Sequence, residues 1–364
     1  MLVLTASFLI SLLTTSLMVR SVKVHGHRSG DRDFTKPQKF HVVAVPRIGG
    51  LGIVLGLLAA LGTLLMVDSE ETMRYLLELL ICATPAFVAG FVQDFTEAIT
   101  PKGRLLATAL SALMAFMLIN ASIRVTDVPG LDWLVTFTAG SLFLTVFTVA
   151  GLANAINIID GFNGLASMCV IIMLTAVAYV AFQVGDRSIA LMALAGIGAI
   201  LGFFVWNFPA GLIFLGDGGA YFLGFYLAEL SILLIQRNPR VSPMFALLLG
   251  IYPVFETLFS VYRRRVLRGR PVGMPDGAHL HSLIYRRFLR WAAGERTARE
   301  LTRRNSMTSP YLWLLSTMSA IPSVLWWHNS RVLQAFIMVF AMTYLWLYWR
   351  IVRFRSPRWM LLRR

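Results

Sequence analysis

The chain has 364 residues, of which 57% are hydrophobic and 14% are charged, and its mean hydropathy is +0.70. Soluble globular proteins carry roughly a quarter charged residues, so this composition excludes an ordinary soluble protein and indicates a polytopic membrane protein. The net charge of +15 alone would suggest nucleic acid as a partner, but the distribution of the basic residues argues against it. Cys82 and Cys169 both fall in apolar runs, so no disulfide is expected.

Apolar runs long enough to cross a bilayer recur along the whole chain. No charged residue precedes the first run and no small-residue cleavage signal follows it, so we expect a retained span rather than a cleaved signal peptide. The predicted fold is all-α: a transmembrane helix bundle of about 11 spans, forming one integral membrane domain over residues 1–364. The predicted spans lie near residues 4–19, 48–67, 75–92, 105–121, 131–152, 164–184, 188–206, 218–236, 243–262, 311–328 and 332–350.

The basic residues indicate how the bundle is oriented. Of the 33 Lys and Arg residues, 27 fall in alternate breaks between spans and in the C-terminal tail, and six fall in the opposite breaks. Basic loops stay in the cytoplasm. The N-terminus is therefore expected outside and the C-terminus inside. The predicted cytoplasmic loops are 20–47, 93–104, 151–163, 207–217 and 263–310.

Five polar clusters interrupt the apolar pattern, and all five fall on the predicted cytoplasmic side. They are KFHVVAVPRIGG (39–50), QDFTEAITPKGR (93–104), NAINIIDGFNG (154–164), FLGDGG (214–219) and PDGAHLH (275–281). The count of Lys and Arg did not use the Asn, Asp, Gly or His residues of these clusters. Their coincidence on one side therefore predicts a single polar active face at the boundary between membrane and cytoplasm.

The residue types in these clusters suit phosphoryl transfer. Carboxylates and side-chain carbonyls are the oxygen ligands that Mg²⁺ or Mn²⁺ prefers, whereas zinc favours nitrogen and sulfur. The candidate oxygen ligands are Asp94, Asp160, Asp217, Asp276, Asn154, Asn157 and Asn163. The candidate partners for phosphate oxygens are Lys39, Arg47, Lys102, Arg104, His279 and His281. The glycines of RIGG and GDGG are expected to let backbone amides approach a ligand closely.

Each polar residue taken alone has a simpler interpretation. A single Asp or Asn at the end of a span is usually a solvated cap, and two histidines in a basic loop are usually surface residues. Glu229 and Glu256 differ because they lie inside apolar spans, where an ionisable group is a functional hypothesis by default. The occurrence of so many such residues on one face is what favours a site.

The order of the motifs resembles the polyprenyl-phosphate N-acetylhexosaminyl-1-phosphate transferases. The resemblance covers about residues 39–281 and rests on PRIGG, QD…PKGRLL, NAINIIDGFNGLA, FLGDGGAYFLG, YPVFETLFSVYRR and PDGAHLH. It implies that a UDP-linked amino sugar donates its sugar-1-phosphate to a membrane polyprenyl phosphate, with Mg²⁺ or Mn²⁺ as cofactor. It also implies a multi-pass protein of the bacterial inner membrane with its active site facing the cytoplasm. The sequence leaves a homodimer open, and nucleic acid is not an expected partner.

The resemblance also implies roles for individual residues. Asp217 is similar to the family's main metal-ligating carboxylate, with Asn157 near the metal and the diphosphate. Asn163 resembles a uracil contact, and Asp160 belongs to the same nucleotide loop. Asp94 matches the second member of an acidic pair. By the same resemblance, the donor or acceptor phosphates are contacted by Lys39, Lys102, His279 and His281.

The sequence departs from the family pattern at three positions. Gln93 precedes Asp94 where relatives usually have Asp, Ser282 follows His281 where relatives often have a further His, and Glu256 stands where many have Asp. The stretch GDGGAYFLG favours an initiator of O-antigen or exopolysaccharide over the peptidoglycan enzyme. The alternatives are an inactive relative and a lipid-linked-sugar flippase. An intramembrane metalloprotease is disfavoured because no H-E-x-x-H helix is present.

Overall fold

The computed structural model describes residues 1–21, 30–31, 45–66, 70–269, 277–288 and 297–353. Within these ranges it is an all-α bundle, as predicted. It also contains one antiparallel pair of two-residue strands. The elements are α1 (Leu2–Arg20), β1 (Gly30–Asp31), β2 (Val45–Pro46), α3 (Gly49–Met66), α4 (Glu70–Thr96), α5 (Pro101–Leu118), α6 (Leu131–Val135), α7 (Thr138–Ile159), α8 (Leu165–Val184), α9 (Arg187–Asn207), α10 (Gly216–Arg237), α11 (Pro243–Leu249), α12 (Ile251–Tyr262), the π-helical turn η1 (Arg263–Leu267), α13 (Leu280–Leu283), the π-helical turn η2 (Ile284–Phe288), α14 (Ala298–Leu325) and α15 (Ser330–Val352).

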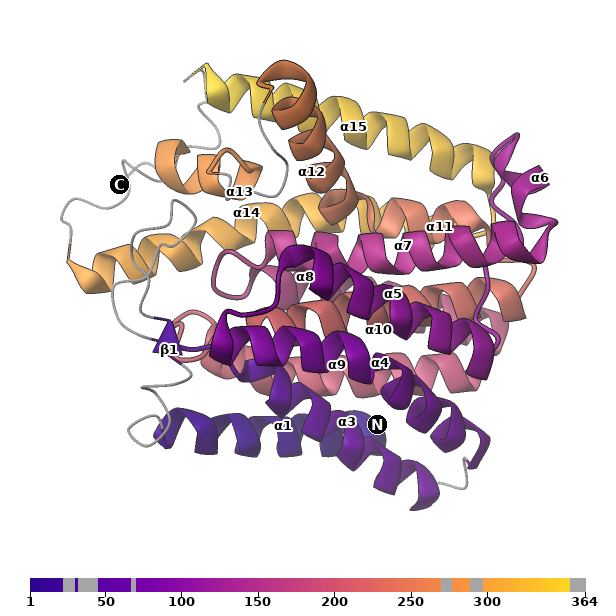
Figure 1. Cartoon of the computed structure of the whole chain (residues 1–364), viewed down its shortest axis with the longest axis horizontal. Helices are drawn as coiled ribbons and strands as arrows, with labels where there is room; N and C mark the ends of the chain where they lie inside the picture. Colours follow the sequence, from indigo (N-terminus) through magenta and orange to yellow (C-terminus); the bar gives the residue numbers. More distant parts are fainter. Residues whose placement is uncertain (22–29, 32–44, 67–69, 270–276, 289–296, 354–364) are drawn as a thin grey trace.

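The long helices run roughly along one axis of the molecule (Figure 1). Eight described helices are long and apolar enough to cross a membrane, and α11 with the helical segment Ile251–Leu267 meets the same criterion as a pair bent by 68°, which is either a broken span or a re-entrant loop. Two further predicted spans, near 105–121 and 311–328, correspond to α5 and the C-terminal half of α14. The number of spans and their orientation remain predictions.

Several predicted loops are shorter than expected because the helices continue into them. Helix α7 extends to Ile159, so Asn154 and Asn157 lie in its last turns rather than in a loop. Helix α10 begins at Gly216, and α14 begins at Ala298, well before its apolar part. Sequence hydropathy marks where a helix becomes apolar, whereas the backbone hydrogen bonds extend through the polar turns that follow.

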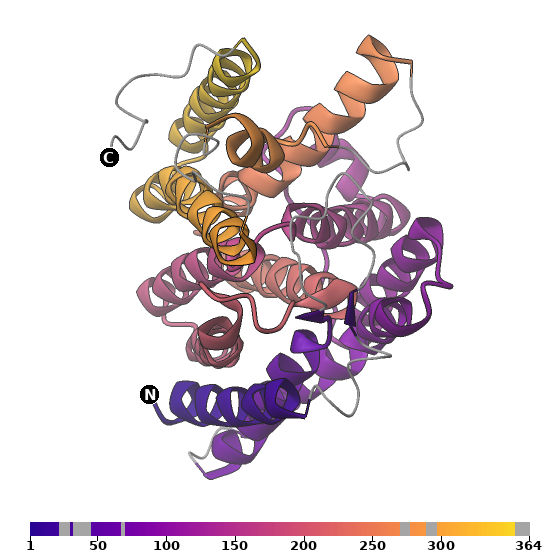
Figure 2. The same cartoon turned by 90° about the vertical axis from the view of Figure 1, so that its left-hand side faces the viewer.

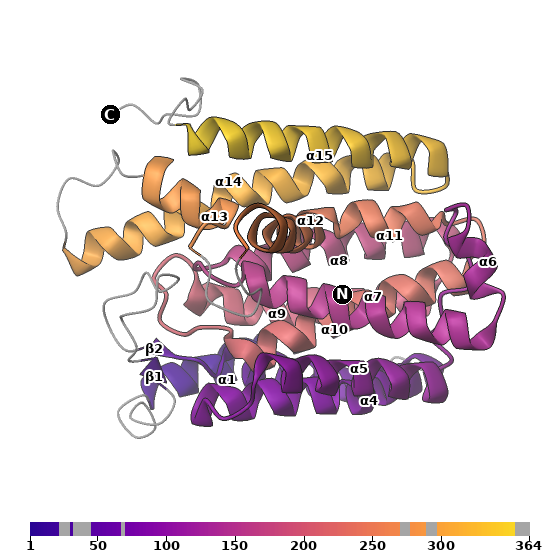
Figure 3. The same ribbon diagram turned by 45° about the horizontal axis from the view of Figure 1, so that its top comes forward.

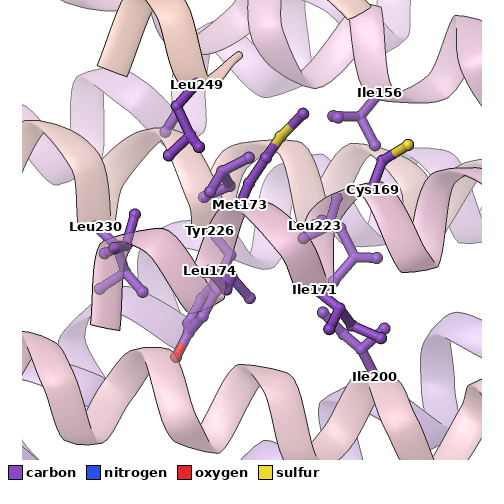
Figure 4. Packing of buried hydrophobic residues seen from close by; sticks show 14 of the residues in the cluster. Ile156, Cys169, Ile171, Met173, Leu174, Ile200, Leu223, Tyr226, Leu230 and Leu249 are labelled. Carbon is purple, nitrogen blue, oxygen red and sulfur yellow. The ribbon is translucent and has the colours of Figure 1, made fainter. Parts of the chain in front are cut away.

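Helix α10 lies at the centre of the bundle. Of its most apolar 18-residue stretch, 94% is buried, compared with 22% for α1 at the periphery. Figure 4 shows Leu223, Tyr226 and Leu230 of this helix packed among residues of α7, α8, α9 and α11. The Tyr226 hydroxyl donates to the carbonyl of Met192 on α9 (2.7 Å). This central position fixes the N-terminal end of α10, which carries Asp217.

Helices α1, α3 and α9 pack through small residues. A Cβ on Gly198 would lie 2.2 Å from the Leu4 carbonyl oxygen, and one on Gly202 would lie 2.6 Å from that of Phe8. Ser11 adds a hydrogen bond from its hydroxyl to the carbonyl of Ala199 (2.6 Å). Because lipid provides no hydrophobic drive between helices, such close contact is the usual way that membrane helices associate.

One end of the bundle gathers the polar motifs. The β1–β2 pair, α13 and the start of α14 lie at the left-hand end of Figure 1, and α6 lies at the opposite end. Figure 2 looks onto the first of these ends, and Figure 3 shows α14 extending past the neighbouring helices there. Described residues of four of the five predicted clusters lie at this end. The fifth cluster begins in α7, and α7 itself ends there.

Candidate functional site

The glycines of RIGG and GDGG bring two backbone segments together. The amides of Gly49 and Gly50 donate to the carbonyls of Phe214 and Leu215 (both 2.9 Å). A Cβ on Gly50 would lie 2.4 Å from the Cα of Gly219. The amides of Gly49 and Gly50 thus have partners within the protein, and the expected approach of these glycines to a ligand stays a prediction. Their small size lets one motif pack directly on the other and fixes the start of α10.

Asp94, on α4, caps the N-terminus of α10. One carboxylate oxygen accepts from the amide of Asp217 (2.9 Å), and the other accepts from the amide of Gly218 (3.0 Å). A carboxylate is favoured there because the first amides of a helix have no partner within the helix and carry partial positive charge. Gly216 takes a positive φ of 78°, and a Cβ there would lie 2.6 Å from the Asp94 carboxylate. The structure therefore places Asp94 directly beneath Asp217.

Asp217 is the carboxylate at the centre of the site, and its side chain is 25% exposed. The Asn157 amide donates to Oδ1 of Asp217 (2.8 Å), and the Arg104 guanidinium pairs with Oδ2. The side-chain amide of Asn157 also carries a carbonyl oxygen that can accept from, or ligate, a further group. Four helices thus meet around Asp217: α4, α5, α7 and α10.

A tyrosine of α10 connects Arg104 to the second asparagine of α7. The Tyr221 hydroxyl donates to the carbonyl oxygen of Asn154 (3.2 Å), and the Arg104 guanidinium lies 5.7 Å from the centre of the Tyr221 ring. Asn154 and Asn157 are three residues apart, so both face α10 from one side of α7. Arg104 therefore lies between the Tyr221 ring and Asp217, and the two asparagines hold the other sides of these partners.

Asp160 follows α7 and lies near a second guanidinium. Burial raises the pKa of the Asp160 carboxyl to about 7, and the positive charge of Arg47 acts in the opposite direction. Arg47 also acts electrostatically on Asp94, and so does Asp160. Arg47, Asp94 and Asp160 therefore form one electrostatic group beside Asp217. Arginine is suited to such a group because it keeps its charge when partly buried.

The two residues after Asp160 contact the histidine loop, which is the described part of the PDGAHLH motif (residues 277–281). The Phe162 ring meets the His281 ring edge-on, with centroids 5.4 Å apart. A Cβ on Gly161 would lie 3.4 Å from Nε2 of His281. The rings of His281 and His279 stack at 5.1 Å. The predicted histidine motif and the predicted nucleotide loop are therefore in direct contact.

Asn163 is held by α14 rather than directed into open space. Its backbone amide donates to Asn305 (2.8 Å), its side-chain amide donates to Ser306 (3.2 Å), and its carbonyl accepts from Ser309 (2.6 Å). Trp313 donates to the next carbonyl, that of Gly164 (3.0 Å). These contacts satisfy the polar groups of a buried loop. The role of Asn163 as a uracil contact remains a prediction.

Three predicted or related residues have other positions. The Gln93 carbonyl accepts from the amide of Ile99 (2.7 Å) and so stabilises the turn before α5. Lys102 is exposed in the first turn of α5, where Thr100 caps the helix through the amide of Gly103. Lys39 lies outside the residues that the structure describes.

The side chains around Asp217 are of the type that suits a magnesium or manganese ion. Among the described residues, no three His, Cys, Asp or Glu side chains are grouped so that they could hold a metal ion. Asp217 and Asn157 supply oxygen donors, the type that Mg²⁺ prefers. Mg²⁺ is usually held by one or two carboxylates together with substrate phosphates and water. This donor set therefore fits the predicted cofactor and does not fit zinc.

Sequence reasoning missed several residues that the structure brings to the site. Tyr221 gave no signal, because an aromatic residue in an apolar span is ordinary. Glu256 did give one, as a carboxyl inside an apolar span, and it proves to contact His279. The polar residues of α14 gave no signal, because nothing in the sequence links them to Asn163. These α14 residues are Asn305, Ser306 and Ser309.

Comparison with known proteins is consistent with this geometry. Residues 76–235 match the model of glycosyl transferase family 4. The chain is 30% identical over 279 residues to the probable undecaprenyl-phosphate N-acetylglucosaminyl 1-phosphate transferase of Bacillus subtilis, covering 76% of this chain and 75% of that protein. It is 27% identical to the undecaprenyl-phosphate alpha-N-acetylglucosaminyl 1-phosphate transferase of Thermotoga maritima, covering 70% and 72%. It is 28% identical to the phospho-N-acetylmuramoyl-pentapeptide-transferase of Streptococcus pyogenes, covering 69% and 76%. By its sequence, its helical bundle and the motifs gathered at one end, the chain belongs to glycosyl transferase family 4, the family of polyprenyl-phosphate sugar-1-phosphate transferases.

Proposed function

We propose that the protein transfers a sugar-1-phosphate, of the N-acetylhexosamine class, from a UDP-sugar to a membrane polyprenyl phosphate. The products are a polyprenyl-diphosphate sugar and UMP. The observation that carries the proposal is the cluster at the start of α10, where Asp217 contacts Asn157 and Arg104 and is held from below by Asp94. Its place at the end of the bundle suits a reaction between a lipid and a water-soluble donor.

The reaction is an exchange at one phosphorus atom. A phosphate oxygen of the acceptor attacks the phosphorus that carries the sugar and forms a new P–O–P bridge. The old bridge to the uridine phosphate breaks, and its oxygen leaves with the electron pair as part of UMP. The acceptor is a phosphate monoester with a second pKa near 6, so at pH 7 it is mostly a dianion and needs little help from a general base.

The protein's part in this reaction is to position phosphates and to balance their charge. Arg104 provides positive charge beside Asp217, and Arg47 provides it near Asp160. When a divalent cation is bound, it supplies Lewis-acid stabilisation of the phosphate oxygens. Asp217 and Asn157 are the residues that would hold it. Gly161 and Phe162 place the histidine loop against the nucleotide loop.

We place this reaction at the cytoplasmic face of a bacterial inner membrane. The clustering of basic residues near the same loops supports this orientation. The product would initiate a cell-surface glycan, and the resemblance of GDGGAYFLG favours O-antigen or exopolysaccharide. Polyprenyl phosphate and the UDP-sugar are then the two partners of the site.

A direct assay tests the proposal. Purified protein is incubated with Mg²⁺, undecaprenyl phosphate and each of a panel of UDP-sugars, and the release of UMP and the formation of lipid-linked product are measured. Release of UMP that depends on both acceptor and metal is the expected result. Movement of a lipid-linked sugar across vesicles without any UMP release would instead indicate a flippase and refute the proposal.

A further inference from the structure

The histidine loop rests on a carboxylate that is completely enclosed by protein. Glu256, on α12, has no exposed surface, and one of its oxygens lies 2.9 Å from Nδ1 of His279. The amide of Leu280 donates to both oxygens (3.2 and 3.3 Å), and the Tyr344 hydroxyl of α15 donates to the second (2.7 Å). A buried carboxylate with three donors is well satisfied as an anion.

This arrangement determines which nitrogen of His279 carries a proton toward Glu256. An ionised carboxylate only accepts hydrogen bonds, so Nδ1 must be the donor. The other ring nitrogen, Nε2, is then the atom left for a ligand, and it can donate to a phosphate oxygen when it carries a proton as well, as it does in the imidazolium. Partners of this kind fix the tautomer and the ring orientation of a functional histidine.

Helix α15 fixes the same loop at a second point. The Tyr348 hydroxyl, one turn after Tyr344, donates to the carbonyl of Ala278 (3.2 Å). Arg263 donates to the Tyr348 hydroxyl oxygen (3.1 Å). The loop is therefore tied to α12 and α15 on one side and contacts Phe162 on the other.

We infer that Glu256 is a positioning residue of the transferase: it holds the His279 ring in one orientation and its negative charge favours a proton on both ring nitrogens, so that Nε2–H donates to a phosphate oxygen of the donor. The inference rests on the proposed function, because it assigns His279 to the donor phosphates. Glu256 itself lies beneath the histidine and acts through it. Neither the match to residues 76–235 nor the motif order identifies this contact.

The test is a double-mutant cycle between Glu256 and His279. Glu256→Gln keeps the size of the side chain but removes the negative charge beside Nδ1, and with it the partner that favours a proton on both nitrogens of His279. We expect kcat/KM for the UDP-sugar to fall roughly 10–100-fold, the range seen when the partner of a functional histidine is removed. In a His279→Ala background the same substitution should change kcat/KM by no more than about twofold, because the group it acts on is gone.

Tyr344→Phe is the matched control, because it removes one donor to the same carboxylate and leaves the contact with His279. We expect it to lower kcat/KM by less than about fivefold, in line with the loss of one hydrogen bond. If Glu256→Gln does not yield folded protein, Glu256→Asp replaces it. This variant keeps the charge but withdraws the carboxylate from Nδ1, and the same dependence on His279 is expected.

The outcomes separate the inference from the proposed function. Equal losses from the Glu256 substitution in both backgrounds, or no loss at all, would overturn the positioning role while the wild type remained an active transferase. A wild type that forms no lipid-linked sugar from any donor would refute the proposed function, and the inference with it. A loss confined to the background that contains His279 supports both.

Discussion

Asp217 and Glu256 are carboxylates at two ends of the same site, and their surroundings differ. Asp217 stands at the start of α10 with a quarter of its side chain exposed, facing Arg104 and Asn157. Glu256 is sealed between α12 and α15 and is satisfied by three protein donors. A carboxylate that still reaches solvent can exchange a partner for a ligand, whereas one fully paired inside the protein can only orient its neighbours.

The two regions of the molecule that carry Asp217 and Glu256 differ in a similar way. The region of α4, α5, α7 and α10 lies almost entirely within the family match and brings charged groups to its polar end. The region of α12 to α15 lies outside that match and contributes hydrogen bonds that hold the histidine and nucleotide loops. The first region is therefore expected to supply the charged groups around Asp217, and the second to position the histidine and nucleotide loops.

Asp217→Asn is expected to have the largest effect and tests the role of the exposed carboxylate directly. The substitution keeps the shape of the side chain and removes its negative charge, so we expect turnover to fall by roughly 100-fold or more. UMP release at saturating Mg²⁺ measures it. Near-normal release from a variant that unfolds at the wild-type temperature would show that this carboxylate is not the metal ligand.

The acidic position beneath Asp217 gives the second-largest expected effect. Asp94→Asn keeps one acceptor but sets an amide NH₂ against one of the first two amides of α10, and a buried donor left without its acceptor costs about 1–3 kcal/mol. If that disturbance reaches Asp217, turnover should fall roughly tenfold, since 1.4 kcal/mol corresponds to a factor of ten.

Gln93→Ala is the neighbouring control. It removes only a hydrogen bond to the turn at Ile99, so turnover should change by less than about twofold. Rates for both variants at pH 8, where the acceptor is ionised, make the comparison. A larger loss from Gln93→Ala than from Asp94→Asn would contradict the assignment of the cap.

Asn305→Ala tests the second region by itself. The buried amide of Asn163 would lose its acceptor, and an unsatisfied buried donor costs about 1–3 kcal/mol. We expect KM for the UDP-sugar to rise about threefold to tenfold with kcat nearly unchanged, because α14 positions the nucleotide loop. Arg303→Ala, an exposed residue of the same helix, is the control and should leave KM unchanged. A fall in kcat with KM constant would place α14 in the chemistry.

The sequence predicted the first region far better than the second. Asp94, Asn157 and Asp217 stand in motifs with distinctive spacing, and their meeting at the start of α10 agrees with the predicted shared face. The glycines were predicted to approach a ligand, and the contact that the structure shows is between two backbones. The two kinds of close approach look the same in sequence.

Contacts between distant segments were beyond the sequence. Asn163 and Asn305 are 142 residues apart, and Glu256 and Tyr344 are 88 apart. Only the packing of helices brings such pairs together, and no periodicity within either helix encodes it. The intramembrane position of Glu256 predicted that it has a function but not which residue it contacts.

The smallest expected effect concerns Asp160 and depends on pH. Its carboxyl keeps its proton up to about pH 7 in the folded protein, whereas an unfolded chain releases it near pH 3.8. The stability that Asp160 contributes is therefore complete below about pH 4 and is lost as pH rises towards and through 7. A shift of about three pKa units corresponds to at most about 4 kcal/mol, and the value is smaller because part of the side chain reaches solvent.

Asp160→Asn does not titrate, so it should gain thermal stability relative to wild type as pH rises. We expect the difference in Tm to be smallest at pH 5, to grow through pH 7 and to level off near pH 8. Thermal unfolding in detergent without substrate or metal measures it at each pH. A difference that did not vary with pH would mean that Asp160 is already ionised at pH 5. The charge of Arg47 would then affect the pKa of Asp160 more than burial does. Asp160 would be a second negative charge, like Asp217, on the side of the site that faces a ligand.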